Sequence, residues 1–338
     1  MGIFASIDTG SNAVRLLVAR TGGNVPLERL RYERTVTRLA QGFFPGTGKG
    51  ESKNLLPRNM ELTLEALKRY SEIISSYSGL SGVRAVGTSA LREAANGAEF
   101  IRLARQRTGI KIEAITHEEE ARLSALGVTA LLKPGGPDPA ADKKTLILDI
   151  GGGSTEWMLT EGASIKNTGV SLKKSGSFPV GVVKLAGLED KEGEAALERD
   201  ISVLAGGLMT ALFPLPSGTV FVVTGGTAST MASIDLGLAQ YEHEKVHGHE
   251  IGLERLTGMC RDLSLLSLEQ RRHSVAGLEP GRADLIIPGL RLTIKIMEKF
   301  GLKSVISSDT GLPEGIILDL GNNIYNGLHD PESQKKWI

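Results

Sequence analysis

The sequence predicts an α/β protein with two duplicated domains, and three observations lead to this prediction. The chain has 338 residues, which is more than a single hydrophobic core usually serves. Apolar strand-like runs alternate with segments whose apolar residues recur at helical spacing, a pattern typical of helices that cover a mixed sheet. Finally, Asp8–Arg15 and Asp149–Glu156 share one pattern: an acidic residue leaves an apolar strand, and small residues and a second apolar run follow.

The first part of the chain is expected to alternate strands and helices. Met60, Leu64, Leu67 and Ile74 lie at helical spacing and predict a long helix that ends near residue 77. Thr116 with Glu119 three residues later is typical of a capping box, so a helix should begin there and run to about residue 131. The other expected elements are strands at 4–8, 14–19 and about 27–36, a glycine-rich loop at 41–50, a strand at 83–86, a helix at 98–107 and a strand at 110–115.

The second part repeats this alternation after a turn-rich linker at 134–139. The last helix is expected to return to the first domain, which would then comprise 1–130 with 311–330, and the second domain would comprise 131–310. The helix around Pro288 is expected to be kinked. The expected elements are strands between 145 and 171, a helix at 192–213, a strand at 220–224, helices at 227–235, 249–266 and 282–300, a strand at 304–307 and a helix at 313–328.

Composition excludes several functional classes. Lys+Arg 39 balances Asp+Glu 39, so no global charge favours nucleic acid or an anionic membrane, although a local basic lining could still bind a polyanion. Aromatic residues form only 4% of the chain, too few for a base-stacking surface. The single cysteine, Cys260, rules out an internal disulfide and fits a reducing compartment. Neither a signal peptide nor a membrane span of ~18 apolar residues is apparent, so we expect a cytoplasmic protein.

The two repeated turns predict a phosphate-binding site. Small residues allow backbone N–H groups to surround an anion, because no Cβ blocks its approach. The acidic residue before each turn could hold a cation against that anion. If both turns hold one phosphate chain, the site lies in a cleft between the two domains. A third segment, Val220–Ala228, also runs from a strand into glycines but has no acidic residue, so it suits positioning rather than metal binding.

Together these motifs resemble the exopolyphosphatase / guanosine pentaphosphate phosphohydrolase (Ppx/GppA) family, in its short two-domain form. The resemblance extends from Ile7 to about Gly315 and is specific as a set, whereas any single motif would be a weak signal. It implies two actin-like, sugar-kinase-like (ribonuclease H-like) domains. The segments that carry it are IDTGSNAVRLLV, GTSALREAAN, HEEEARL, LILDIGGGSTE, SFPVGVVKL, VVTGGTAS, YEHEKVHG and RADLIIPGL.

The resemblance implies Mg²⁺-dependent hydrolysis of terminal phosphoanhydride bonds. The substrate would be inorganic polyphosphate or, as the alternative, the 5′ end of guanosine pentaphosphate, a molecule of the stringent response. Polyphosphate is placed first because nothing in the sequence indicates a guanine-specific pocket. Whether K⁺ assists and whether the chain forms a homodimer stay open.

Three carboxylates are the candidate metal ligands: Asp8, Asp149 and Glu156. Hard carboxylate oxygens suit Mg²⁺, which would neutralise the substrate and polarise the reacting phosphorus. The alternative is that a strand-end Asp only caps the turn that follows it. Glu156 lies on the strand after its turn, so its direction depends on the alternation of side chains along that strand.

Two further residues are the candidate catalytic groups. In the resembled family the Glu directly before Ala-Arg activates the attacking water, and that position here is Glu120. Acidic residues are also favoured at any helix start, and Glu119 is expected to act in the cap. Arg92 would bind phosphate oxygens and stabilise charge on the transferred group, unless it is a solvated surface residue. The residues expected to bind substrate through their turns are Ser11, Asn12, Gly152, Gly153, Ser154, Gly225, Gly226 and Thr227.

Two motif matches are rejected. His243–His247 matches the H-E-x-x-H zinc motif, which requires a continuous helix, but Gly248 follows directly and no third ligand is apparent. Gly46–Gly50 resembles a phosphate-binding P-loop but lacks its first glycine and the Ser/Thr after the lysine. Two rival functions stay open: an ATP-dependent kinase or ATPase with a second substrate, and a non-catalytic sensor of guanosine alarmones or polyphosphate.

Overall fold

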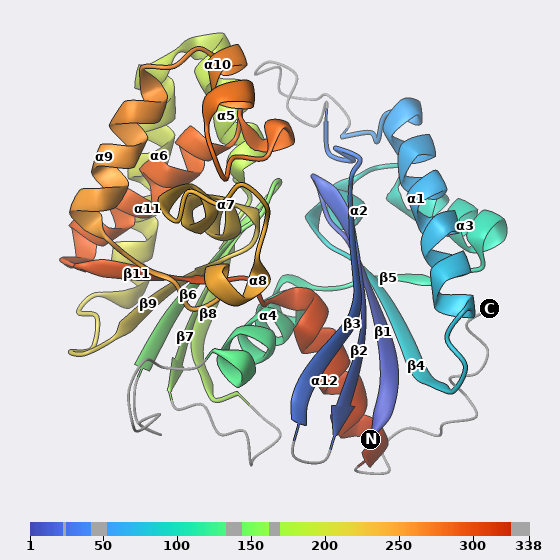
Figure 1. Cartoon of the computed structure of the whole chain (residues 1–338). Helices are drawn as coiled ribbons and strands as arrows, with labels where there is room; N and C mark the ends of the chain where they lie inside the picture. Colours follow the sequence, from blue (N-terminus) through green and yellow to red (C-terminus); the bar gives the residue numbers. More distant parts are fainter. Residues whose placement is uncertain (23–24, 42–52, 133–143, 162–169, 326–338) are drawn as a thin grey trace. The chain divides into compact units, whose positions relative to one another are not determined.

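The chain forms two compact units, each with its own sheet (Figure 1). The computed structural model describes residues 1–338 except 23–24, 42–52, 133–143, 162–169 and 326–338. Unit 1 contains the described residues up to Leu131 and those from Gly311 onward, and unit 2 contains those from Leu132 to Thr310. The expected linker at 134–139 and the P-loop-like segment at 46–50 lie outside the described residues.

Unit 1 is built on a five-stranded sheet in the order β3-β2-β1-β4-β5. The first three strands are antiparallel neighbours, and β4 and β5 run parallel to β1. The strands are β1 (Gly2–Thr9), β2 (Ala13–Gly22), β3 (Val25–Val36), β4 (Leu80–Gly87) and β5 (Ile112–Ala114). The helices are α1 (Pro57–Ser75), α2 (Ser89–Glu93), α3 (Gly97–Thr108), α4 (His117–Leu131) and α12 (Leu312–Tyr325).

The alternation of apolar residues along β1 gives this sheet two covered faces. Ile7 belongs to a buried cluster with Leu67 of α1 and Phe100 of α3, whereas Phe4 belongs to a second cluster with Leu123 of α4 and Ile316 of α12. Successive side chains of a strand point to opposite faces, so α1 and α3 cover one face and α4 and α12 cover the other. Helices α4 and α12 therefore pack on the same face of this sheet. This packing positions the start of α4.

The backbones of α4 and α12 touch. A Cβ atom on Gly127 would lie 1.9 Å from the Gly311 carbonyl oxygen, and one on Gly315 would lie 1.8 Å from the Leu123 carbonyl oxygen. Only glycine permits so close an approach. Helix α12 thus packs closely against α4 within unit 1.

Unit 2 repeats the arrangement of unit 1 with one further strand, in the order β10-β11-β9-β6-β7-β8. An antiparallel hairpin again starts the sheet, and β9 and β11 again run parallel to its first strand. The strands are β6 (Lys144–Ile150), β7 (Thr155–Glu161), β8 (Leu172–Phe178), β9 (Val220–Thr224), β10 (Glu250–Gly252) and β11 (Ser304–Ser308). The shared strand order confirms the predicted duplication.

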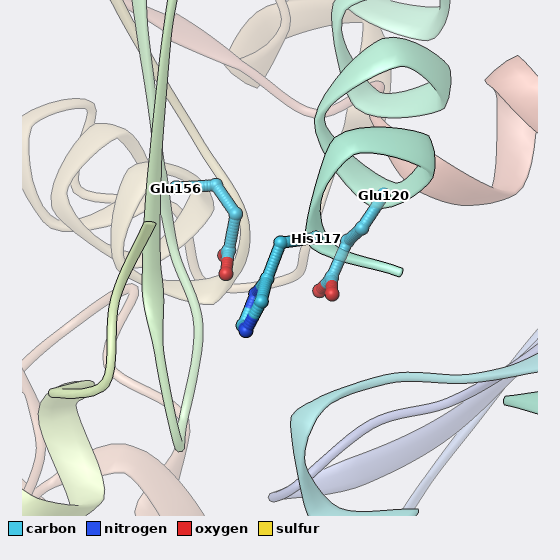
Figure 2. A group of neighbouring side chains, drawn as sticks. All are labelled: His117, Glu120 and Glu156. Carbon is cyan, nitrogen blue, oxygen red and sulfur yellow. The ribbon is translucent and has the colours of Figure 1, made fainter. Parts of the chain in front are cut away.

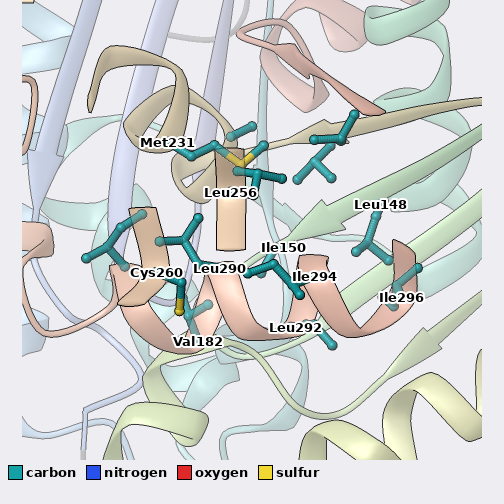
Figure 3. Close-up of a cluster of buried hydrophobic side chains, with 14 of the residues drawn as sticks. Leu148, Ile150, Val182, Met231, Leu256, Cys260, Leu290, Leu292, Ile294 and Ile296 are labelled. Carbon is teal, nitrogen blue, oxygen red and sulfur yellow. The ribbon is translucent and has the colours of Figure 1, made fainter. Parts of the chain in front are cut away.

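Helices bury an extended apolar core against the sheet of unit 2. Figure 3 shows part of it: Leu148 and Ile150 of β6 lie in one cluster with Leu290 and Ile294 of α11 and with Val182 of α5. The helices are α5 (Val182–Glu192), α6 (Glu194–Leu212), α7 (Gly226–Asp235), α8 (His243–Val246), α9 (Leu253–Ser264), α10 (Leu268–Ser274) and α11 (Ile286–Phe300), with a 3₁₀ turn η1 (Pro280–Arg282) before α11.

Three sequence predictions in this unit need correction. Helix α5 was not predicted, because its residues follow the polar strand β8, which itself lies beyond the expected strand region. The expected helix at 249–266 begins with the short strand β10. The helix expected from 282 begins at Ile286, so Pro288 lies in its first turn, where a missing N–H removes no helical hydrogen bond. Among the described residues, no helix has the length and apolar character needed to cross a membrane.

Candidate active site

The turns of the two hairpins have the same local structure. Gly10 N donates to the Ala13 carbonyl at 3.1 Å, and Gly151 N donates to the Ser154 carbonyl at 3.0 Å. Each turn thus closes on itself immediately after the acidic strand residue. A Cβ on Gly10 would lie 3.1 Å from the Ala13 oxygen and one on Gly151 would lie 2.9 Å from the Ser154 oxygen. Glycine at positions 10 and 151 therefore suits the close approach of the backbone within each turn.

The two hairpins differ in the residue that faces the acidic one. Asp8 on β1 is the register partner of Arg15 on β2, and the two side chains form an ion pair. Asp149 on β6 is the register partner of Glu156 on β7. Residues directly opposite in an antiparallel pair have their Cβ atoms about 4.5–5.5 Å apart, on the same face. The first hairpin thus places opposite charges face to face, and the second places two carboxylates face to face.

Asp8 is fully buried at the end of β1. Its side chain is 0% exposed, and burial raises the pKa of its carboxyl, against the opposing effect of the Arg15 charge. Its Oδ1 atom, like Oδ1 of Asn12, accepts no hydrogen bond from the described residues. Ser11 is anchored by a contact of its Oγ with Ser89 Oγ at 2.8 Å. Two buried oxygens without a donor at one turn are what a bound cation or a hydrogen-bond donor of a ligand would satisfy.

Asp149 lies near the end of β6 and Glu156 near the start of β7, on either side of the hairpin turn. Glu156 is 2% exposed, and its Oε1 accepts a hydrogen bond from Ser177 Oγ of β8 at 2.9 Å. Asp149 is half-buried and lies beside Thr224 at the carboxyl end of β9. Because Glu156 directly faces Asp149 in the antiparallel pair, the two side chains share one face of the sheet.

The β6–β7 turn, which contains Gly152, Gly153 and Ser154, is supported by the start of α5. Val182 N donates to the Gly151 carbonyl at 3.0 Å and Val183 N donates to the Gly152 carbonyl at 3.1 Å. A Cβ on Gly181 would lie 2.4 Å from the Gly151 oxygen. Helix α5 therefore fixes the backbone of the turn. The motif SFPVGVVKL indicated this segment by resemblance only, and no periodic signal identified its role.

The third glycine turn lies beside Asp149. Gly225 follows β9 with a φ of 86°, and a Cβ on it would lie 3.0 Å from Asp149 Oδ1. The guanidinium of Arg282 covers the next residue, because a Cβ on Gly226 would lie 1.6 Å from Arg282 Nη1. Thr227 is buried in the first turn of α7. The turn thus lies against the Asp149 carboxylate at Gly225 and against the Arg282 guanidinium at Gly226.

Arg92 holds the start of α4. Its Nη1 donates to Glu120 Oε2 at 3.1 Å and to the Ile115 carbonyl at 2.9 Å. Its Nη2 lies 2.8 Å from His117 Nδ1. Glu120 is 6% exposed, and a His117 ring nitrogen and a Glu120 carboxylate oxygen lie within 4.8 Å of each other. Figure 2 shows His117 and Glu120 on the first turn of α4, and it also draws Glu156 on β7.

His117 is a candidate functional residue that the sequence interpretation missed. Its spacing to Glu120 is i, i+3, which places two side chains on the same side of a helix. That spacing was visible in HEEEARL. The adjacent run of three glutamates makes this spacing hard to recognise, because a helix start favours acidic residues whatever their function.

Glu119 does not act as the second half of a capping box. The Thr116 Oγ1 atom accepts a hydrogen bond from Glu119 N at 3.2 Å, as expected. The Glu119 carboxylate, however, binds Arg122 at 2.8 Å and Arg84 at 3.1 Å, and both arginines also contact Asp319 of α12. Burial acts to raise the pKa of Glu119, but these arginines lower it overall. Glu119 therefore joins α4 to α12 through ion pairs, whereas Glu120 faces Arg92.

The zinc-like motif does not form the required helix. Helix α8 comprises only His243–Val246, and His247 follows its end. His243 Nδ1 lies 2.5 Å from Asp309 Oδ2, and the two imidazole rings stack with centroids 5.5 Å apart. The two imidazoles therefore form a local stacked pair, and the two histidines do not lie on one face of a continuous helix.

Comparison with known proteins gives a consistent result. The sequence profile of the Ppx/GppA phosphatase family matches residues 17–323. The chain is 28% identical over 337 residues to Exopolyphosphatase 2 of Mycobacterium tuberculosis, covering 94% of this chain and 98% of the relative. It is 27% identical to a bifunctional 3-dehydroquinate synthase/phosphatase of Fusobacterium nucleatum, covering 93% of this chain. The chain spans about half (46%) of the length of that bifunctional relative.

The fold is likewise shared with solved structures. A crystal structure of the Aquifex aeolicus member of the Ppx/GppA family superimposes with a TM-score of 0.76 at 26% identity, covering 97% of this chain and 99% of that chain. A structure of an exopolyphosphatase-like protein gives a TM-score of 0.80 at 25% identity, covering 95% and 99% of the two chains. The two-sheet architecture predicted from the sequence is therefore confirmed.

Proposed function

Because the chain belongs to the Ppx/GppA phosphatase family and is a phosphoanhydride hydrolase, we propose that it removes terminal orthophosphate from inorganic polyphosphate. Likeness to an exopolyphosphatase over 98% of that relative's length supports this substrate. The proposal includes a Mg²⁺ site, a general base and residues that bind the phosphate chain. It also includes a cytoplasmic location, which the single cysteine favours.

The observation that carries the proposal is the facing pair Asp149 and Glu156. Like charges at facing positions destabilise a sheet, and a divalent cation between them would offset this cost. Carboxylate oxygens are the ligands that Mg²⁺ prefers, so the pair fits this ion. Asp8 has an accepting oxygen as well, but it also pairs with Arg15. Asp149 and Glu156 are therefore the principal proposed ligands, and Asp8 is a secondary one. When bound, Mg²⁺ would neutralise substrate charge and polarise the phosphoryl group.

Glu120 is the proposed general base. A base must hold its carboxylate within hydrogen-bond reach of the attacking water, and Arg92 fixes Glu120 Oε2 while the first turn of α4 fixes its backbone. We propose that Arg92 acts partly through this contact, in addition to any direct contact with phosphate oxygens. Water would attack the terminal phosphorus, Glu120 would accept its proton, and the shortened chain would leave with the bond electrons.

The glycine turns are proposed to hold the phosphate chain. The backbones of Ser11, Asn12, Gly152, Gly153 and Ser154 would donate hydrogen bonds, and Gly225, Gly226 and Thr227 would bound the substrate. Preorganised donors of this kind stabilise charge without rearrangement during the reaction. Glu120 belongs to unit 1 and the carboxylate pair to unit 2, so the proposal requires that one substrate molecule be bound by residues of both.

Phosphate release from long polyphosphate and from guanosine pentaphosphate, at identical Mg²⁺ concentration, tests the proposal. We expect the higher kcat/KM with polyphosphate. A higher kcat/KM with guanosine pentaphosphate would establish the alternative substrate. Binding of either compound without release would indicate a sensor, and release only with an acceptor molecule would indicate a kinase.

A further inference from the structure

The contact between Arg92 and His117 determines which imidazole nitrogen carries the proton. Arg92 Nη2 lies 2.8 Å from His117 Nδ1. A guanidinium has only hydrogen-bond donors, so Nδ1 must be the acceptor. A neutral imidazole that accepts at Nδ1 carries its proton at Nε2. While Arg92 makes this contact, Nε2 is therefore the nitrogen of His117 that can donate a hydrogen bond.

We propose that His117 is a second catalytic residue of this site and that its Nε2–H binds a non-bridging oxygen of the phosphoryl group under attack. This inference rests on the proposed function, because it needs Glu120 to activate water at the same phosphorus. It adds a donor that neither the family resemblance nor the motif pattern assigns.

The position of His117 suits this role. A His117 ring nitrogen and a Glu120 carboxylate oxygen lie within 4.8 Å of each other, and one guanidinium contacts both side chains. Arg92 thus sets the position of the base and the tautomer of the imidazole together. A base and a donor fixed side by side on one helical turn can bind a water molecule and an adjacent phosphoryl oxygen at the same time.

The proposed hydrolysis needs no proton transfer from His117. The bond from the water oxygen to phosphorus forms, and the bond from phosphorus to the bridging oxygen breaks. The water proton goes to Glu120, and the shortened chain takes the electron pair. The Nε2 proton stays on the ring and donates a hydrogen bond to a phosphoryl oxygen, whose negative charge it stabilises.

The same tautomer argues against His117 as a metal ligand. A histidine binds a metal through an unprotonated ring nitrogen. Here Nδ1 accepts from Arg92 and Nε2 carries the proton. Binding a cation would require Arg92 to give up this contact.

Two substitutions of His117 separate the donor role from a purely structural one. In His117→Asn the amide oxygen lies close to the former Nδ1 position, so the contact with Arg92 can persist without the distal donor. In His117→Gln the amide nitrogen can reach the former Nε2 position, so the distal donor is retained. We expect His117→Asn to lower kcat on polyphosphate by about 10²–10³-fold, the usual effect of losing one such donor. His117→Gln should retain a kcat at least about tenfold higher than His117→Asn.

The control is Glu118→Gln, an exposed neighbour on the same turn, whose kcat should match that of the wild type. If His117→Asn were as active as His117→Gln or more active, the imidazole would act through Arg92 and the inference would be wrong. Recovery of kcat in both variants at excess Mg²⁺ would make His117 a metal ligand and would also overturn it. Imidazole ¹⁵N chemical shifts of the wild-type protein test the tautomer without turnover: a proton on Nδ1 would contradict the inference even if no phosphate were released.

Discussion

Asp149 and Glu156 stand directly opposite each other on β6 and β7, while the matching position opposite Asp8 holds Arg15. The duplicated hairpins are thus alike in backbone and opposite in charge at one position. Like charges at facing positions destabilise a sheet, and a cation bound between the two carboxylates would offset this cost. This difference places the proposed metal site on the second hairpin.

Asp149→Asn and Glu156→Gln should each abolish stabilisation of the protein by Mg²⁺. A ligand at 100 times its Kd adds about 2.7 kcal/mol to the free energy of unfolding, so the wild-type Tm should rise by several degrees when Mg²⁺ is added. Thermal melts with Mg²⁺ and with chelator measure this shift. Glu161→Gln is the control, because Glu161 lies on the same strand but pairs with Lys173. A full Mg²⁺ shift in either site variant would contradict the assignment.

Glu120→Gln should lower kcat by ~10²–10⁴-fold, the range for a lost general base, while KM changes little. The matched control is Glu119→Gln on the same turn. Because Glu119 binds Arg84 and Arg122, its loss should lower the free energy of unfolding by about 1 kcal/mol or less and leave kcat largely intact. Steady-state kinetics and urea denaturation of both variants separate the roles. Exchanged effects would show that the base is Glu119.

Gly225→Ala should weaken Mg²⁺ binding without replacing a proposed ligand. Its backbone lies at φ 86° and ψ −167°, a region that costs other residues about 1–3 kcal/mol, and the new Cβ would press on Asp149 Oδ1. We expect the Mg²⁺ concentration for half-maximal activity to rise roughly 10–100-fold, as for other groups that orient metal ligands. Gly237→Ala is the control: it also has a positive φ, of 61°, but no atom lies within 4 Å of its Cβ. If the Mg²⁺ concentration for half-maximal activity rose equally in both variants, general destabilisation would explain the effect and the prediction would be wrong.

Stability should fall with rising pH because of Asp8. Burial raises the pKa of this carboxyl in the folded protein, so between the unfolded value of about 3.9 and the raised value the folded state binds more protons than the unfolded state. The contribution of Asp8 to the free energy of unfolding is fully present below the pKa of the unfolded state, and it is lost as pH rises through the pKa of the folded state. In chelator, the free energy of unfolding of the wild type minus that of Asp8→Asn should decrease across this window, by at most about 1.4 kcal/mol per pH unit. A constant difference would show that the Asp8 pKa is not raised.

The duplicated fold could be predicted from the sequence because its signals are local. Strands such as Val220–Thr224 are continuous apolar runs between turn residues, and helix α1 has regular apolar spacing. Helix α5 could not be predicted, because its start is defined by hydrogen bonds from Val182 and Val183 to a turn about thirty positions earlier in the chain. Such tertiary contacts leave no periodic pattern in the sequence.

The sequence predicts which residue types belong to the candidate site. It does not predict most of the contacts between them. The acidic residues before the turns were visible, but the register that sets Arg15 against Asp8 and Glu156 against Asp149 depends on the hairpin closing at Gly10 and Gly151. Arg92 was expected to contact phosphate, whereas its contacts with Glu120 and His117 join α2 to the first turn of α4 over about 25 positions of the chain and leave no local pattern in the sequence.

Hydrolysis of polyphosphate by the wild-type protein with Mg²⁺ in ¹⁸O-labelled water tests the central claim most directly. If water attacks the terminal phosphorus, each released orthophosphate should carry one ¹⁸O atom and the shortened chain should carry none, as measured by mass spectrometry after a single turnover. Label in the shortened chain, or no release without an added acceptor, would contradict the proposed terminal hydrolysis.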